Sequence, residues 1–200
     1  MREVLIQESA IGKTLVVVDV QPEYQSYFVN MHHNLFEYIN EHNNQLSNLL
    51  FLYNGESLGM IEEHEFRYWM LDNGLDEEIA FSVDVYDKGY AFFRYCIDGG
   101  IDDENIVNLI KYMIHIGVND SRDLDEDFWN GFIEKYGDEN IRELLEFSDD
   151  AINIPDLMDI LKPLNNITLV GGGINECLKE VEIALDTLNK SYYTWPQFTY

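Results

Sequence analysis

Short apolar runs without strict alternation mark the predicted strands. Thr14–Val20, Leu49–Tyr53 and Ile167–Val170 are rich in aliphatic and β-branched residues, a pattern typical of strands that are covered on both faces. Pro22 stops regular structure after the first of these runs. We predict a further strand over Phe81–Tyr86, where the chain leads towards a lysine and a glycine.

Apolar residues three and four positions apart predict helices. Ile106, Leu109, Ile110 and Met113 have this spacing, and the acidic residues before them suit a helix N-terminus. The predicted helices cover Leu35–His42, Ile61–Leu71, a segment from Asp102 through Met113, Asp125–Lys135, Glu139–Phe147, Pro155–Leu161 and Asn175–Leu188.

Strands and helices that follow one another in this order predict an α/β fold with a mostly parallel sheet. We expect a three-layer α/β/α arrangement in a single domain over residues 1–200. The stretch from about residue 101 to 150 has helical periodicity and many acidic residues, so we interpret it as a helical insertion or cap within that domain.

The strongly acidic composition excludes some classes of binding partner. The 200 residues include 38 Asp and Glu against 12 Lys and Arg, which gives a formal net charge of −26. Such a chain repels phosphate backbones and anionic membrane surfaces, and it contains no local basic patch. No stretch reaches the roughly 18 apolar residues that a membrane-spanning helix needs. We therefore expect neither nucleic acid nor a membrane as partner.

The two cysteines, Cys96 and Cys177, have unlike surroundings, which argues against a disulfide framework. The opening residues from Met1 to Val4 lack the layout of a signal peptide. We therefore expect a reducing, cytoplasmic setting. Cys96 stands between Tyr95 and Ile97 and is interpreted as a core residue.

Asp19 is the first candidate for chemistry, since it stands at the carboxyl end of a predicted buried strand. Ligands of open α/β sheets bind at that edge. A carboxylate after three valines is costly to bury unless it has a partner or a task. The structural alternative is that Asp19 caps the following turn or forms an ion pair.

Cys177 is the second candidate. It follows a predicted strand, the glycines Gly171–Gly173 and Asn175, which is a suitable N-cap residue. The first turn of a helix favours a thiolate, and glycines let backbone amides approach an oxyanion closely. The alternative is a buried structural cysteine.

Lys88 is the third candidate, because it is one of few cations and stands between an apolar segment and aromatic residues. Its alternative interpretation is a surface lysine whose stem lies along apolar surface.

The three stretches around these residues together resemble the isochorismatase-like cysteine hydrolases. This superfamily includes nicotinamidases, ureidoacrylate and carbamoyl-sarcosine amidohydrolases and isochorismatases. Its members have a strand that ends in Asp-x-Gln, a lysine before a small-aromatic segment, and a glycine turn that enters a helix on the cysteine. The matching stretches here are Leu15–Gln21, Lys88–Phe93 and Val170–Leu178, in the same order.

The resemblance implies a cofactor-independent cysteine hydrolase that acts on a small amide- or imide-like molecule. Asp19 would be the general base, Lys88 would keep it ionised, and Cys177 would be the nucleophile of a thioester intermediate. Backbone amides at Gly173 and Cys177 would hold the oxyanion. The resemblance further implies that Gln21, Phe92 and Ile174 contact substrate, and that the protein is a homo-oligomer.

The chain also departs from the family. Ile174 stands where the family has a small residue or threonine, and Asn54-Gly55-Glu56 replaces the metal-binding Asp-x-His of nicotinamidases. The five histidines have no metal-ligand spacing, so we predict no metal site. Other interpretations stay open. The protein is a catalytically inactive scaffold that uses its acidic surface to bind a partner, or it hydrolyses an ether in the isochorismatase manner, which does not require the cysteine. The acidic helices between Asp102 and Asp150 are a solvated surface or mimic DNA.

Overall fold

The computed structural model describes residues 13–88, 96–118, 124–137, 142 and 157–200. The chain divides into two compact units. The sheet unit comprises Met1–Gly89, Leu164–Ile174 and Ser191–Tyr200, and the helical unit comprises Tyr90–Pro163 and Asn175–Lys190. The prediction of one domain over residues 1–200 stays a prediction.

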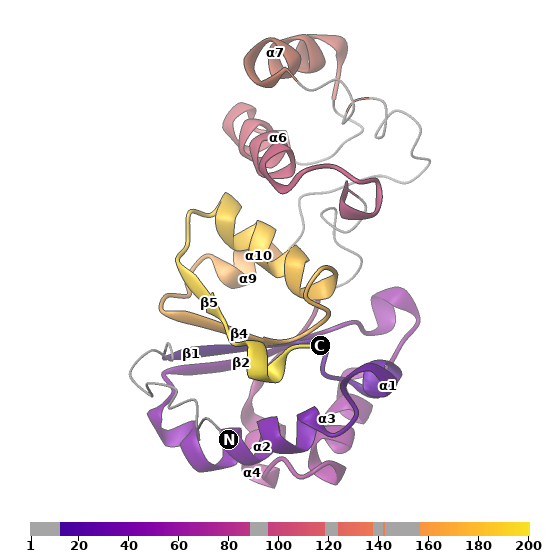
Figure 1. Cartoon of the computed structure of the whole chain (residues 1–200), viewed down its shortest axis with the longest axis vertical. Coiled ribbons are helices and arrows are strands. Elements are labelled where there is room, and N and C mark those ends of the chain that lie inside the picture. The colour runs from indigo at the N-terminus through magenta and orange to yellow at the C-terminus, as the bar shows by residue number, and fades with distance from the viewer. Residues whose placement is uncertain (1–12, 89–95, 119–123, 138–141, 143–156) are drawn as a thin grey trace, which may run out of the picture. The chain divides into compact units, whose positions relative to one another are not determined.

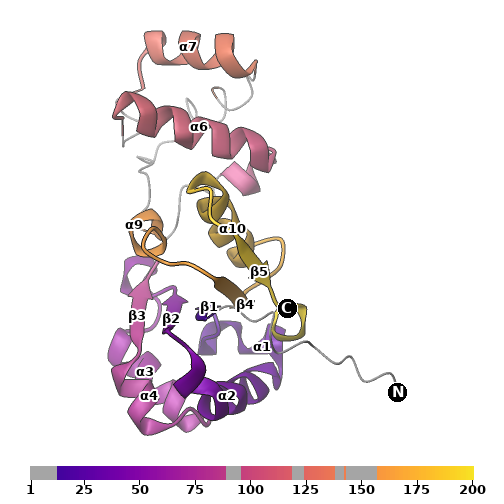
Figure 2. The ribbon, with the colours of Figure 1, turned by 90° about the vertical axis from the view of Figure 1, so that its left-hand side faces the viewer.

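Five parallel strands form the sheet, in the order β3-β2-β1-β4-β5 (Figures 1 and 2). Val17 of β1 is in register with Phe51 of β2 on one side and Val170 of β4 on the other. This sheet with its helices confirms the predicted α/β class and is consistent with a three-layer α/β fold. The strands are β1 (Thr14–Val18), β2 (Asn48–Tyr53), β3 (Asp84–Asp87), β4 (Ile167–Gly171) and β5 (Tyr192–Thr194).

Helices α2, α3 and α4 lie together on one face of the sheet in both ribbon views (Figures 1 and 2). Alternate residues of the strands, such as Leu15, Val17 and Phe51, share a core with residues of these helices, such as Phe36 and Met70. The helices of this unit are α1 (Gln25–Phe28), α2 (Met31–His42), α3 (Glu63–Asp72) and α4 (Glu77–Ser82), with short 3-10 helices at Pro22–Tyr24, Asn43–Gln45, Glu56–Leu58 and Pro196–Phe198.

The residues that point to the opposite face of the sheet are buried as well. Val16, Val18, Leu52 and Leu169 are at most 1% exposed. Burial on both faces explains why these strands read as continuous apolar runs rather than as alternating patterns.

The helical unit contains α6 (Asp103–Ile116), α7 (Glu126–Tyr136), α9 (Leu157–Leu161) and α10 (Cys177–Thr187). Tyr112 of α6 packs against Phe128 and Phe132 of α7. An ion pair of 2.6 Å between Lys179 Nζ and Asp103 Oδ2 joins α10 to α6. None of the helices within the described residues is long and apolar enough to span a membrane.

Several of the predicted boundaries are wrong. Strand β1 ends at Val18 rather than at Val20, and helix α2 begins at Met31 rather than at Leu35. Phe81 and Ser82 end helix α4 rather than begin a strand, and β3 starts at Asp84. The guanidinium of Arg67 donates hydrogen bonds to the carbonyls of Ala80 and Val83, which satisfies the end of this short helix.

Helix α10 begins at Cys177 rather than at Asn175. Glu176, with φ −131° and ψ −107°, is the N-cap residue, so Asn175 lies in the turn before the helix. The helix predicted over 139–147 lies outside the described residues apart from Arg142, and Pro155 lies outside them too.

Candidate active site

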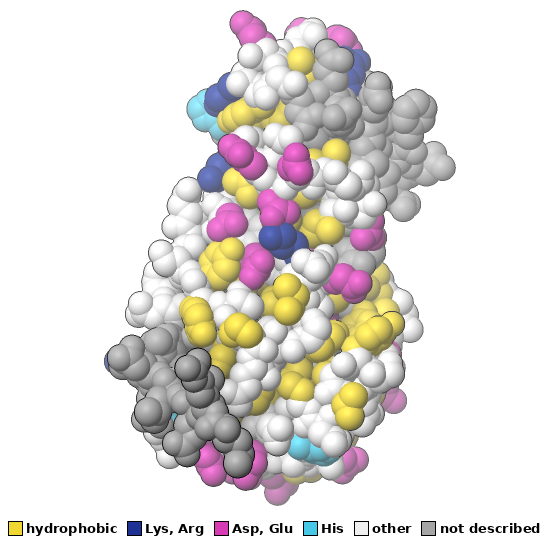
Figure 3. Space-filling view, viewed as in Figure 1, with side chains coloured by type: hydrophobic (Ala, Val, Ile, Leu, Met, Phe, Trp, Pro, Cys, Tyr) yellow, Lys and Arg dark blue, Asp and Glu magenta, His cyan; other side chains and the backbone are white. Residues whose placement is uncertain are grey.

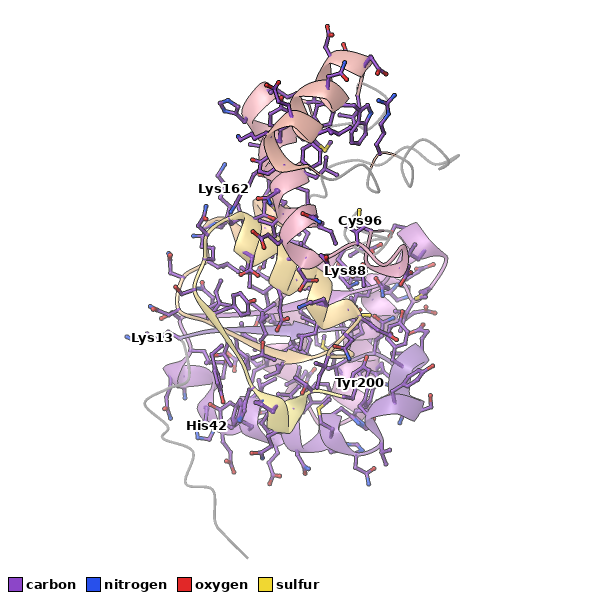
Figure 4. All side chains as sticks on the ribbon, turned by 45° about the horizontal axis from the view of Figure 1, so that its top comes forward. Lys13, His42, Lys88, Cys96, Lys162 and Tyr200 are labelled. Carbon is purple, nitrogen blue, oxygen red and sulfur yellow. The ribbon has the colours of Figure 1, made fainter. Side chains whose placement is uncertain are left out.

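The carboxyl ends of β1 and β4 lie at the point where the strand order reverses. The chain runs from β1 outward to β2 and β3 on one side, and β4 and β5 lie on the other. Ligands of open α/β sheets bind in the crevice at such a switch point. Figure 4 shows Lys88 and Tyr200 towards this end of the sheet and Lys13, which precedes β1, towards the opposite end.

Asp19 and Lys88 form a buried ion pair at this edge. Lys88 Nζ lies 3.2 Å from Asp19 Oδ2, and the two side chains are 2% and 0% exposed. The backbone N–H groups of Asp19 and Lys88 donate to the carbonyls of Leu52 and Tyr53 at the end of β2, at 2.8 and 2.9 Å. The structure therefore brings together two of the three residues that the sequence predicted to be catalytic.

The backbone of Asp19 has a positive φ. Its φ of 49° lies in the left-handed region, which L-residues adopt uncommonly, although aspartate and asparagine do so more often than most. Strain of this kind persists only where the surrounding structure holds the residue in place, and such residues cluster at functional sites. The Oη of Tyr200 donates a hydrogen bond to the Asp19 carbonyl at 3.2 Å and contributes to that hold.

Asn54 is a further member of this cluster. Its Nδ2 donates to Asp19 Oδ2 at 3.3 Å and to Tyr24 Oη at 2.9 Å. The side chain of Gln21 accepts from the Asn54 backbone N–H at 2.8 Å and donates to its carbonyl at 3.0 Å. From the sequence, Asn54 was interpreted only as a residue that replaces a metal ligand. Its position directly after β2 also indicated that it lies at the carboxyl edge of the sheet, where Asp19 lies.

Two acceptor oxygens in this cluster have no hydrogen-bond partner among the described residues. They are Asp19 Oδ1 and Asn54 Oδ1, and both atoms are buried. A buried acceptor without a partner costs on the order of 1–3 kcal/mol. Native proteins contain few such groups, and each one calls for a structural or functional reason.

The glycine turn after β4 lies beside the end of β1. Val18 is in register with Gly171, whose φ is +81°, and a Cβ on Gly171 would collide with the Val18 carbonyl. Tyr200 holds the turn through its backbone: its N–H donates to the Gly172 carbonyl at 3.2 Å, and its carbonyl accepts from the Ile174 N–H at 2.9 Å. Tyr200 therefore joins the loop of Asp19 to the glycine turn.

Cys177, the third predicted residue, is the first residue of α10 in the helical unit and is half-buried. Cys96 is fully buried, and this burial raises the pKa of its thiol to about 12, which agrees with its interpretation as a core residue. The described contacts establish the pairing of Asp19 with Lys88, whereas the triad that adds Cys177 stays a prediction.

The predicted binding residues have different surroundings. Ile174 is 52% exposed next to Tyr200, and Gly173 lies within the same turn. Gln21 is buried and uses its amide to hold Asn54. Phe92 lies outside the described residues. Within the described part of the chain, no group of three or more His, Cys, Asp or Glu side chains is arranged to hold a metal ion.

Comparison of the chain with models of protein families, with curated proteins and with solved structures finds no match.

Proposed function

We propose that the protein is a cofactor-independent cysteine hydrolase that cleaves the C–N bond of a small amide- or imide-like molecule. Asp19, Lys88 and Cys177 are its catalytic residues. The substrate is a small molecule, the chain works as a homo-oligomer, and the setting is cytoplasmic.

One observation supports this proposal above the others: the buried Asp19–Lys88 pair at the switch point of the sheet. A buried ion pair contributes little to stability when it is compared with apolar residues of similar volume. Its presence beside a carboxylate oxygen that has no partner among the described residues, on a residue with a positive φ, is better explained by chemistry than by folding. Cys177 follows Ile174, whose N–H donates to the Tyr200 carbonyl, by only three positions.

The reaction divides into two steps. Asp19 accepts the proton of the Cys177 thiol, and the thiolate attacks the carbonyl carbon, so that a C–S bond forms. Backbone N–H groups at Gly173 and Cys177 stabilise the oxyanion. Asp19 returns the proton to the nitrogen as the C–N bond breaks, which releases the amine and leaves a thioester.

Water then completes the turnover. Asp19 accepts a proton from the water molecule, whose oxygen attacks the thioester carbon. The C–S bond breaks, the acid leaves, and the proton returns to the sulfur. Throughout, the ammonium of Lys88 stabilises the ionised form of Asp19 and the negative charge that develops beside it.

A panel of nicotinamide, ureido and N-carbamoyl compounds tests this function through release of ammonia. We expect at least one compound to be hydrolysed, and mass spectrometry to detect an acyl adduct on Cys177. Cys177→Ala and Asp19→Asn should each reduce kcat by at least about a hundredfold. Cys96→Ala is the matched control and should retain activity. Hydrolysis that survives Cys177→Ala would overturn the thioester mechanism, and inactivity across a wide panel would favour a non-catalytic scaffold.

A further inference from the structure

Two hydrogen-bond donors reach the same oxygen of the buried aspartate. Lys88 Nζ lies 3.2 Å from Asp19 Oδ2, and Asn54 Nδ2 donates to that oxygen at 3.3 Å. Lys88 follows β3 and Asn54 follows β2, so the two donors come from different segments of the chain. Their places beside the carboxylate therefore depend on what holds these two segments together beyond the ends of the strands.

The carboxylate of Asp87, the last residue of β3, joins the two segments. Its Oδ1 accepts from the Gly55 N–H at 3.0 Å and from the Ser57 Oγ at 2.9 Å, and its Oδ2 accepts from the Ser57 N–H at 3.0 Å. Gly55 is the N-cap residue of the 3-10 helix Glu56–Leu58, and Ser57 lies within that helix. One side chain thus fastens the turn after β2 to the end of β3.

The approach of Asp87 to this turn is close. A Cβ on Gly55 would lie 2.8 Å from Asp87 Oδ2, so a side chain at position 55 would displace the carboxylate. Asp87 is exposed, and water could hydrate its charge without any help from the protein. Its three hydrogen bonds instead satisfy the N–H groups at the start of a short helix and fix the position of the turn.

The residues that Asp87 joins are direct neighbours of the two donors. Asp87 immediately precedes Lys88, and Gly55 immediately follows Asn54. Consecutive Cα atoms are only about 3.8 Å apart, so a shift between positions 87 and 55 moves both donors relative to the carboxylate that they share. The Lys88 N–H also donates to the Tyr53 carbonyl at 2.9 Å, which ties the same two segments together one residue earlier in β2.

We propose that Asp87 is the positioning residue of the base, because its hydrogen bonds to the turn over residues 55–57 set the places of Lys88 and Asn54 on Asp19 Oδ2. Without the Asp87 carboxylate, the turn and the end of β3 separate, and water reaches the Lys88 ammonium. This inference rests on the proposed function, in which the ionised Asp19 accepts the thiol proton. It adds a residue that orients this base without contact to the substrate.

The ammonium protons of Lys88 test the inference in the full chain without any substrate. A buried, hydrogen-bonded ammonium group exchanges its protons with water slowly, and NMR of the protein labelled with ¹⁵N-lysine measures the rate. We expect Asp87→Ala to raise this rate at least about tenfold. Asp84→Ala, at the exposed aspartate that begins β3, is the matched control and should leave the rate unchanged. Faster exchange of only the Gly55 and Ser57 amides in Asp87→Ala would overturn the proposal and leave Asp87 a role in the turn alone.

Asp87→Asn separates the position of the side chain from its charge. Asparagine keeps one oxygen that can accept from the Gly55 N–H and the Ser57 hydroxyl, but it carries no charge. It should therefore restore most of the slow exchange at Lys88. A rate equal to that of Asp87→Ala would assign the effect to charge and overturn the proposal. If Asp87→Ala fails to fold, Ser57→Ala removes only the hydroxyl contact and should raise the rate at least about twofold. No change at Lys88 in Ser57→Ala would then overturn the proposal.

The hydrolysis assay distinguishes this inference from the function on which it rests. Asp87→Ala should lower kcat at least about tenfold and change KM little, since Asp87 orients the base and does not contact the substrate. Faster exchange at Lys88 in a protein that hydrolyses none of the compounds would contradict the proposed function and leave this inference standing. Hydrolysis with the same kcat in Asp87→Ala and in the unaltered chain would overturn this inference alone.

Discussion

The two ends of the same parallel sheet use polar residues differently. At the amino end, Lys13 is exposed, its carbonyl accepts the Ser47 N–H at 2.7 Å, and Asn48 donates to the Thr14 hydroxyl. At the carboxyl end, Asp19 and Lys88 are buried as an ion pair, and two buried acceptors have no partner within the part of the chain that the structure describes. The amino end shows that strands of this sheet can terminate in ordinary, satisfied polar groups, so the costly arrangement at the other end is not a requirement of the fold.

The surface near the carboxyl end of the sheet carries exposed apolar side chains. Tyr27 and Val29, in and just after α1, are 68% and 66% exposed, and the Tyr27 ring stacks on Tyr200 with centroids 6.2 Å apart. The space-filling view shows hydrophobic side chains gathered over this part of the sheet unit (Figure 3). Apolar surface thus lies next to the residue that joins the Asp19 loop to the glycine turn.

Substitution of Lys88 should produce the largest difference between the two ends. Lys88→Met leaves the Asp19 carboxylate buried without its partner and should lower the free energy of unfolding by about 3–5 kcal/mol. Lys13→Met at the exposed amino end should change it by less than about 0.5 kcal/mol. Urea unfolding followed by circular dichroism measures both.

A double variant separates the charge from the packing. Asp19→Asn with Lys88→Met removes both charges, so it should be less destabilised than the sum of the single variants. Equal stability of Lys88→Met and Lys13→Met would contradict the account of the carboxyl end.

The glycine turn should give the next largest effect. Gly171→Ala introduces a Cβ against the Val18 carbonyl at a positive φ, and we expect a loss of about 3 kcal/mol in the free energy of unfolding. Gly59→Ala is the matched control, since Gly59 has a φ of +67° but open space around its Cα, and it should cost about 1 kcal/mol. If thermal denaturation gave the two variants the same loss, close packing of the turn against β1 would be refuted.

Loss of the Tyr200 hydroxyl should have a smaller effect. Tyr200→Phe removes the hydrogen bond to the Asp19 carbonyl and should lower the free energy of unfolding by about 1 kcal/mol. It should also speed hydrogen exchange of the Asp19 amide, which donates to Leu52, because Tyr200 positions this loop. Tyr193→Phe, at an exposed tyrosine of β5, should change neither quantity. If the Asp19 amide exchanged at the same rate in Tyr200→Phe as in the unaltered chain, Tyr200 would not position this loop.

The smallest expected effect is the contribution of His32 to the pH dependence of the free energy of unfolding. Burial lowers the pKa of this side chain from 6.5; the hydrogen bond that its Nε2 makes to Asn73 Oδ1 raises the pKa, and the neighbouring His33 lowers it. As the pH falls through 6.5, the unfolded chain takes up a proton before the folded chain does, so the free energy of unfolding decreases until the lower, folded-state pKa is passed.

His32→Gln should therefore flatten the decrease in stability between pH 7.5 and 5.5 relative to the unaltered chain. Urea midpoints at the two pH values measure this, and a slope in His32→Gln equal to that of the unaltered chain would refute the assignment to His32.

The sequence predicted the sheet well because its strands are buried on both faces, and apolar runs such as Leu15–Val18 carry that information locally. The pairing of Asp19 with Lys88 was also foreseeable, because both follow strands and the carboxyl ends of parallel strands meet at one edge. Helix α4 was missed because its six residues are too few for a clear helical period, and Arg67 from α3 satisfies its last carbonyls.

Other parts of the site could not be predicted because they depend on contacts distant in sequence. The position of Tyr200 against Asp19 joins residues 181 apart in the chain. The role of Gln21 as the residue that holds Asn54 depends on the exact ends of β1 and β2. No local pattern in the chain records either contact.

The reactivity of Cys177 tests the central claim most directly. Alkylation by iodoacetamide near neutral pH, followed by mass spectrometry, compares Cys177 with Cys96, whose buried thiol has a pKa raised to about 12. The account predicts that Cys177 reacts at least about tenfold faster than Cys96, and that Asp19→Asn removes most of this advantage. Equally slow alkylation of both cysteines, or a Cys177 rate that Asp19→Asn leaves unchanged, would contradict the account.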